Sequence, residues 1–351
     1  MLSSLSSNVV LAKARAKYGK RLKEKDYRNL LDCKSVAEVA AYLKANTDYH
    51  DVLTGINEYD IHRGQLEVLI KQKLFYNLSS FVRYELSVGE QLADYVIARA
   101  EIEEILDALM LMSAGRQEEY SQAAPLYLAK HTKIHMEQFS SIQTYGEFLD
   151  ALGSSVYRRL LAPFEPKPGE PVDVFAVENQ LYSYLFSHVQ EIIDHRVRGK
   201  TKKEVRELFQ GYIDLENYAR IIRMKKRFRA HPEFIEKNLL PFGSLKPKQL
   251  NALIHAETAN QAAAIFRTTS RGKKTANVEY NFVDELAQRI KFISGKHYIH
   301  FSSHPPVVLL SYIFLADTEV HNITTIVEGI RYQVSVDDIK KLLILPTDKV
   351  G

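Results

Sequence analysis

The amino-acid sequence predicts an all-α protein, and three observations support that prediction. Glycine (15) and proline (11) are both scarce for a chain of 351 residues, which suits long helices. Apolar residues recur at spacings of three and four, the period of an amphipathic helix. Alternating runs of the kind that form strands are short, and residues 334–336 are the only mild candidate.

The chain divides into helices and loops by the same rules. Residues 66–82 and 177–193 each place a continuous apolar stripe on one face of a helix. Loops are expected near residues 113–117, 163–171, 241–247, 268–276 and 301–306, where turn-forming residues gather. The segment 163–171 holds four prolines in nine residues, so it must be an extended connector.

A capping-box pattern, Ser/Thr-x-x-Glu/Gln before an apolar run, occurs three times. It begins at Ser35, Thr144 and Thr258. In such a box the hydroxyl accepts from the backbone amide three residues on, and the acid or amide side chain reaches back. Apolar residues follow at equivalent offsets, so each box predicts the start of a short buried helix.

Two further patterns recur in the same order. Longer amphipathic helices pass through Glu67, Glu178 and Glu285. A pattern of acid, aliphatic, any residue and Glu/Asn then begins at Glu101, Asp214 and Glu319, which lie 34, 36 and 34 residues further on. The order and spacing indicate a threefold internal repeat.

The repeat predicts three similar helical domains, at residues 1–117, 118–235 and 236–351. A period of about 110 residues exceeds that of the common solenoids, which favours closure around a pseudo-threefold axis, as a disc, funnel or bowl, over a linear stack.

Composition and charge exclude several classes. The 47 basic and 43 acidic residues give a net charge of +4, too small to indicate a nucleic-acid-binding protein unless concentrated in a patch. The single cysteine, Cys33, excludes an intramolecular disulfide and a cysteine metal cluster. The best apolar run, 305–316, is too short to span a bilayer, and the N-terminus lacks a basic signal region. We expect a cytoplasmic protein, soluble or peripheral to a membrane.

No catalytic motif is present. Residues 199–201 (Gly-Lys-Thr) match the end of a phosphate loop, but Asp194 stands where its first glycine belongs. His131 and His135 could share a helix face, and His297, His300 and His304 form the best metal candidate, without a nearby acid to orient them. Packed or exposed histidine and packed Cys33 are the favoured interpretations, so we expect no catalytic residue, metal or cofactor.

Two basic stretches, 195–206 and 220–229, stand out. The second continues the Asp214 pattern and so forms the end of a helix, where cations also complement the helix dipole. A solvated face is the simpler interpretation. The functional one is a partner-binding surface, to which we assign Arg220, Arg223, Lys226, Arg227 and Arg229. Nucleic acid is the less favoured partner because no recognition motif accompanies the charge.

The chain resembles the C subunit of bacterial and archaeal V/A-type rotary ATPases, which is similar to the d subunit of the eukaryotic V-ATPase. The most specific segments are 212–223 (YIDLENYARIIR) and 232–245 (PEFIEKNLLPFGSL), where Phe242 occupies a position at which glycine or another small residue is expected. Residues 11–18, 26–31, 35–39 and 47–49 also resemble the family, and the likeness runs through nearly the whole length.

The resemblance implies an all-helical funnel of three domains around a pseudo-threefold axis. It implies a non-catalytic rotor component that joins the central stalk, with D- and F-type subunits, to the proteolipid ring, and transmits torque for proton or sodium transport. The resemblance does not indicate whether the coupled ion is a proton or sodium, or whether the complex mainly makes or hydrolyses ATP. Two alternatives remain: a helical scaffold that binds other proteins or RNA, and a zinc enzyme built on the three C-terminal histidines.

Overall fold

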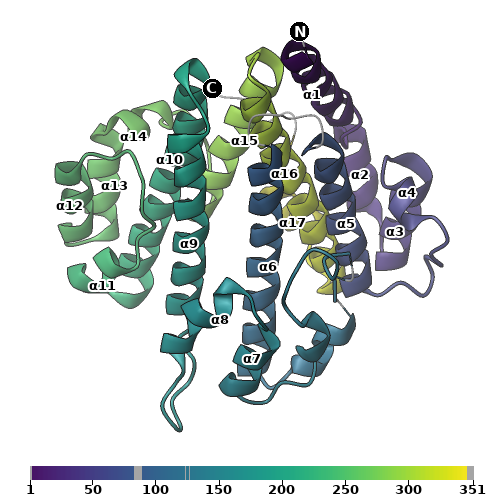
Figure 1. The fold of residues 1–351 in the computed structure, drawn as a ribbon, viewed down its shortest axis with the longest axis horizontal. Helices are drawn as coiled ribbons and strands as arrows, with labels where there is room; N and C mark the ends of the chain where they lie inside the picture. Colours follow the sequence, from purple (N-terminus) through teal and green to yellow (C-terminus); the bar gives the residue numbers. More distant parts are fainter. Residues whose placement is uncertain (1, 83–88, 123, 126, 346–351) are drawn as a thin grey trace. The chain divides into compact units, whose positions relative to one another are not determined.

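The computed structural model describes residues 2–82, 89–122, 124–125 and 127–345. Every regular element within these residues is a helix, so the predicted all-α class is confirmed (Figure 1). The chain forms two compact units, each made of separate segments. The first contains Met1–Ser35 and Gln190–Gly351, and the second contains Val36–Val82 and Glu90–Val189. This partition does not test the three domains expected from the repeat, and they stay a prediction.

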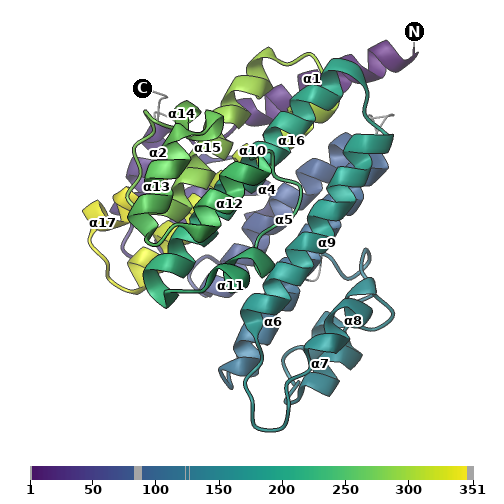
Figure 2. The same ribbon diagram turned by 90° about the vertical axis from the view of Figure 1, so that its left-hand side faces the viewer.

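Four long helices form the body of the first unit: α1 (Leu2–Gly19), α10 (Gly199–Arg223), α15 (Val283–Phe301) and α16 (Pro305–Arg331). Helices α15 and α16 form an antiparallel pair in which α15 packs on α10 and α16 packs on α1 (Figure 2). The first and last parts of the chain therefore share one core.

Shorter helices complete the first unit. They are α2 (Glu24–Asp32), α11 (Pro232–Lys237), α12 (Pro247–His255), α13 (Ala259–Thr268), α14 (Ser270–Lys274) and α17 (Val336–Leu342). Helices α12 and α13 pack against α10, and α2 packs against α17. A π-helix, Met224–Phe228, directly continues α10.

The second unit contains two long helices, α5 (Arg63–Val82) and α6 (Gly89–Ser113), and most of a third, α9 (Val174–His195). Its short helices are α3 (Val36–Asn46), α4 (His50–Leu53), α7 (Tyr145–Ala151) and α8 (Val156–Leu161). Three 3₁₀ turns, Gln117–Gln122, Met136–Gln138 and Ala162–Phe164, connect them.

Helices α5 and α9 cover the two predicted apolar stripes, and four of the five expected loops separate helices as predicted. The expected loop at 268–276 is wrong in part, because it contains α14. Thr269 begins this helix by accepting a hydrogen bond at Oγ1 from the amide of Gly272. Glycine is required there because a Cβ on Gly272 would lie 2.0 Å from the Phe266 carbonyl oxygen.

One of the three predicted capping boxes is formed in full in the structure, and a second is formed in part. Thr144 Oγ1 accepts from the amide of Glu147, whose carboxylate accepts from the amide of Thr144. Thr258 Oγ1 accepts from the amide of Gln261, but the Gln261 side chain accepts from the amide of Glu257 and not from that of Thr258. Helix α3 begins directly after Ser35, as its box predicts. Apolar residues four and eight positions into all three boxes are buried: Val39, Leu43, Phe148, Leu152, Ala262 and Phe266.

None of the helices that the structure describes combines the length and the apolar content needed to cross a bilayer.

Candidate interaction surfaces

The acid of the third sequence pattern anchors another segment of the chain in each of its three occurrences. The Glu101 carboxylate on α6 accepts hydrogen bonds from the hydroxyls of Thr132 and Tyr157. Asp214 on α10 accepts from the amides of Ser244 (2.7 Å) and Leu245 (3.1 Å). Glu319 on α16 accepts from the amide of Leu22 (2.7 Å). The acids therefore satisfy polar groups that long helices alone would leave unpaired.

The anchored segments lie at equivalent places in the sequence. Thr132, Leu245 and Leu22 stand 12 or 13 residues before the boxes at Thr144, Thr258 and Ser35. The first acid thus anchors the segment before the second box, the second acid the segment before the third, and the third acid the segment before the first.

An asparagine three residues after the acid anchors a second loop in two copies. Asn217 donates to the carbonyl of Leu240 (2.8 Å) and accepts from its amide (2.7 Å). Asn322 makes the same pair of bonds with Ile344, at 2.7 and 3.0 Å. The first copy has Glu104 at this position, and it accepts from the Tyr120 hydroxyl instead.

The helices that carry the acids end alike. Gly115, Arg229 and Gln333 all have positive φ, at 66°, 47° and 54°, the left-handed conformation that commonly terminates helices. The next residue in each copy donates its amide to the carbonyl ten residues after the acid, which belongs to Leu111, Met224 and Gly329 respectively. These are equivalent helix caps.

The second copy contains one additional residue before its cap. The left-handed residue follows the acid by 14 positions at Gly115 and at Gln333, but by 15 at Arg229. The π-helix Met224–Phe228 accommodates this extra residue, as π-bulges in α-helices generally do. It leaves Lys226, Arg227 and Arg229 exposed, together with the Phe228 ring, which is 70% exposed.

The five residues predicted to form a partner-binding surface differ in how deeply they are buried. Arg220 is buried and donates to the carbonyl of Asn238 at 3.2 Å. It is therefore part of the interior of the first unit and not of its surface. Arg223 is half-buried and lies 3.5 Å from the Asp284 carboxylate. Lys226, Arg227 and Arg229 lie together on the surface at the π-turn. Whether the five bind a partner stays a prediction.

Lys225, also in the π-turn, points inward. Its ammonium donates to the carbonyls of Ile254 (2.6 Å) and Ala256 (2.5 Å) at the end of α12, and burial lowers the pKa of this lysine. The two bonds attach the π-turn to a neighbouring helix, which leaves the next three residues projecting outward.

The three C-terminal histidines have separate surroundings. His304 shares a hydrogen bond of 2.9 Å with the Thr201 hydroxyl, and His300 packs edge-on against Tyr18. His297 packs against the rings of Tyr298 and Phe301. Burial, followed by nearby arginines, lowers the pKa of His300.

The other histidines and the cysteine lie apart from these. His131 packs against Phe75, and His135 lies 3.6 Å from Glu137. The Cys33 thiol lies 3.4 Å from the Asn29 carbonyl. No group of three or more metal-ligating side chains occurs in the described part of the chain.

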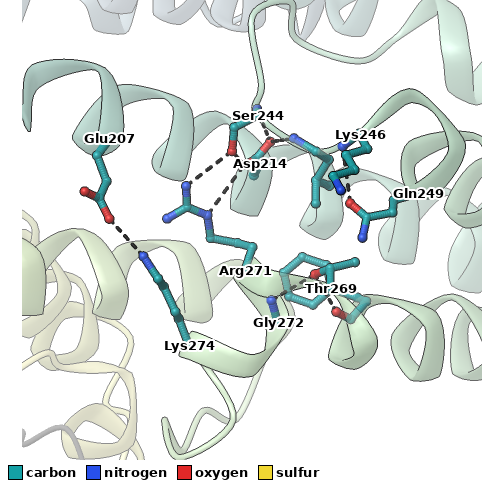
Figure 3. A network of polar contacts seen from close by, with 11 residues as sticks. Glu207, Asp214, Ser244, Lys246, Gln249, Thr269, Arg271, Gly272 and Lys274 are labelled. Carbon is teal, nitrogen blue, oxygen red and sulfur yellow. Dashed lines mark hydrogen bonds and ion pairs between the residues drawn. The ribbon is translucent and has the colours of Figure 1, made fainter. Parts of the chain in front are cut away.

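A polar network that no sequence motif indicated joins α10 and α14 (Figure 3). The Arg271 guanidinium lies 3.5 Å from the Asp214 carboxylate and donates to the Ser244 hydroxyl at 3.3 Å. Beside it, Lys274 and Glu207 form an ion pair of 2.9 Å. No local pattern indicated this network because its members come from three segments, α10, the loop before α12, and α14.

These features define an all-helical protein with acid-anchored long helices and a local group of exposed cations at the end of α10. The family model described as "ATP synthase (C/AC39) subunit" matches residues 10–342, and the chain belongs to this family.

Two curated relatives are both C subunits of A-type ATP synthases. The one from Methanosarcina acetivorans is 26% identical over 81% of this chain and 72% of the relative. The one from Methanosarcina mazei is 23% identical over 97% of this chain and 94% of the relative.

Proposed function

We propose that this chain is the C-type subunit of a V/A-type rotary ATPase and acts there as a non-catalytic adaptor of the rotor. It would join the central-stalk subunits of the D and F type to the proteolipid ring and transmit torque during proton or sodium transport. The match to the ATP synthase subunit family over residues 10–342 carries the proposal.

The contacts between the repeats support a mechanical role. Each of the three acids joins a long helix to the segment that precedes a capping box, and the last joins Glu319 to Leu22. These contacts join segments that lie far apart in the sequence, and a torque-bearing part needs such resistance to local opening.

The π-turn supports a specific contact surface. It is a place where the second copy differs from the other two, and it is there that Lys226, Arg227, Phe228 and Arg229 are exposed. We propose that this basic tip, defined as residues 226–229, docks on an acidic surface of the stalk or the ring. Charge complementarity would set the orientation, and the Phe228 ring would supply apolar contact. The adaptor would thus be peripheral to the membrane, on its cytoplasmic side, and attached through the ring.

The proposal is tested by a tagged pull-down from gently solubilised source membranes, followed by mass spectrometry. Recovery of the proteolipid, central-stalk and nucleotide-binding subunits is the expected result. Recovery of the chain from the soluble fraction without them would contradict it and favour the helical scaffold that binds other proteins or RNA.

A charge-reversal variant tests the surface separately. In Lys226→Glu/Arg227→Glu we expect recovery of the partner subunits to fall at least about tenfold, since opposed charges become like charges. The matched control is Lys130→Glu/Lys133→Glu, which reverses two exposed lysines of the second unit. Equal recovery in the two variants would remove residues 226–229 from the interface and leave the adaptor role standing.

A further inference from the structure

Two adjoining cavities lie beside the Arg271 network in the first unit. The outer cavity, of about 460 Å³, is lined by Lys202, Lys203, Arg206 and Gln210 of α10, by Ser244, and by Arg271 of α14. The inner cavity, of about 320 Å³, has mainly apolar and aromatic walls, which include Leu208, Tyr212, Ile290, Ile293, Tyr298 and Phe314. Glu207 and Arg271 line both cavities, so the two adjoin at these side chains.

The outer cavity carries more positive than negative charge. Lys202 and Arg206 share one carboxylate oxygen of Asp194, at 3.0 and 2.8 Å. One carboxylate neutralises only one of the two cations. Lys203 forms no ion pair with the residues that the structure describes. Glu207, the acid that lines the cavity, is paired with Lys274.

Arg271 is held in place before any ligand binds. Its side chain is only 15% exposed, and its guanidinium contacts Asp214 and Ser244 (Figure 3). It also lies directly over Gly211, where a Cβ would come within 2.7 Å of Nη1. Because Asp214 already balances its charge, Arg271 offers the remaining N–H groups of a fixed guanidinium as hydrogen-bond donors to an oxyanion, and little side-chain entropy remains to be lost on binding.

The apolar walls of the inner cavity indicate that the ligand carries an organic group beside its phosphate. Its walls include the rings of Tyr212 and Phe314, and it shares the side chains of Glu207 and Arg271 with the outer cavity. A bare phosphate would occupy only the outer cavity. A phosphate with an attached ring or short chain would fill both, and burial of the apolar part would add affinity.

We propose that these two cavities form a binding site for an organic phosphate, with the phosphate among Lys203, Arg206 and Arg271 and its organic group in the inner cavity. The site differs from a phosphate loop, which the sequence lacks, because side-chain cations and not backbone amides contact the anion. The inference does not depend on the proposed rotor function.

Calorimetric titration of the full chain tests the site with three probes: inorganic phosphate, adenosine monophosphate, and a short-chain lysophosphatidate below its micelle concentration. We expect at least one organic phosphate to bind about tenfold or more tightly than inorganic phosphate. Preference for the nucleotide or for the lipid would identify the source. Absence of binding by all three, or inorganic phosphate binding as tightly as both others, would overturn the proposal.

Variants locate the binding. Lys203→Glu should weaken the tighter organic phosphate by about tenfold or more, since it places a like charge beside the anion. The control is Lys200→Glu, one turn away on α10, where the lysine is exposed and lines neither cavity. It should change the affinity by less than about twofold because exposed charges are screened. Equal effects of the two reversals would overturn the site.

Two further variants report on Arg271 and on the inner cavity. Gly211→Ala should weaken binding by displacing the guanidinium, with circular dichroism as the check on folding. The chain has no tryptophan, so Tyr298→Trp places a single indole in the inner cavity wall. Its emission should shift with the organic phosphate and not with inorganic phosphate. An emission unchanged by a bound organic phosphate would contradict occupation of the inner cavity.

Discussion

The Glu319 carboxylate accepts a hydrogen bond from the amide of Leu22 at 2.7 Å, although 297 positions separate the two residues in the sequence. Nearby, Asn322 donates to the hydroxyl of Tyr27 at 3.3 Å. Arg15 donates to the carbonyls of Ile299 (2.8 Å) and Ser302 (2.7 Å). The N-terminal helices are therefore held by the last long hairpin, and the two ends of the chain stabilise each other.

Removal of the Glu319 carboxylate should loosen the start of the chain. In Glu319→Ala the buried amide of Leu22 loses its acceptor, at a cost of about 1–3 kcal/mol. Hydrogen exchange followed by mass spectrometry should show faster exchange across residues 20–32. Glu24→Ala, which removes an exposed carboxylate in the same region, is the control. Unchanged protection of residues 20–32 in Glu319→Ala would show that other contacts hold this segment.

The equivalent asparagines should be comparably important for stability. Asn217→Ala and Asn322→Ala each leave one buried backbone amide and one carbonyl without a partner, so each should lower the free energy of unfolding by about 2–4 kcal/mol. Urea denaturation followed by circular dichroism measures this change. Asn46→Ala, which removes an exposed side chain bonded only to the Tyr42 carbonyl, should cost less than about 1 kcal/mol. A small effect of both buried substitutions would contradict the anchoring role.

The helices and the capping boxes could be predicted because their signals are local. A box such as Thr144 with Glu147 involves residues three apart, and an apolar stripe repeats within one helix. The acid pattern also predicted the right helices. It could not predict the partners of Asp214 and Glu319, since these depend on how distant segments pack.

The candidate interaction surfaces also depend on contacts between distant segments, which local sequence signals do not reveal. Arg220 was grouped with exposed cations from its neighbours in the sequence, yet Asn238 lies close enough to accept its hydrogen bond in the interior. The extra residue before Arg229 is visible only when the three copies are aligned on their helix ends. Of these ends, Gly115 alone has a residue type that marks a left-handed cap. Phe242, where glycine or another small residue was expected, has a φ of 70°.

The stability of the second unit should depend on the ionisation of Glu104. The pKa of this carboxyl is raised to about 7, chiefly by burial and to a smaller extent by the negative charges of Asp107 and Glu103. Lys71 and the hydrogen bond from the Tyr120 hydroxyl act in the opposite direction. Between pH 4.5 and 7 the folded state therefore binds more protons than the unfolded state. This stabilisation is fully present below pH 4.5 and is lost as the pH rises through about 7, by about 3 kcal/mol at most.

Urea denaturation at pH 5 and pH 8 measures the effect, and Glu104→Gln should reduce the difference between the two. Burial also raises the pKa of Glu101 and of Asp107, so part of the dependence should remain. Glu118→Gln, which neutralises an exposed carboxyl nearby, should leave the difference unchanged. A pH dependence that is the same in wild type and Glu104→Gln would assign it to other groups.

Deletion of Lys226 should convert the π-turn into an ordinary α-helical end. The spacing from Asp214 to the left-handed cap would become 14 residues, as in the other two copies. Circular dichroism should show unchanged helix content, and the free energy of unfolding should fall by no more than about 1–2 kcal/mol. The basic tip would lose a cation and its spacing, so recovery of partner subunits should fall.

A deletion elsewhere provides the contrast. Ala108 is buried in α6, which has no π-turn, so its removal rotates the following residues by about 100° and exposes apolar side chains. That variant should lose several kcal/mol of stability, or fail to fold, where deletion of Lys226 does not. If both deletions were equally damaging, the π-turn would be a structural requirement of α10. If deletion of Lys226 left both folding and partner recovery intact, the extra residue would have no part in the interface.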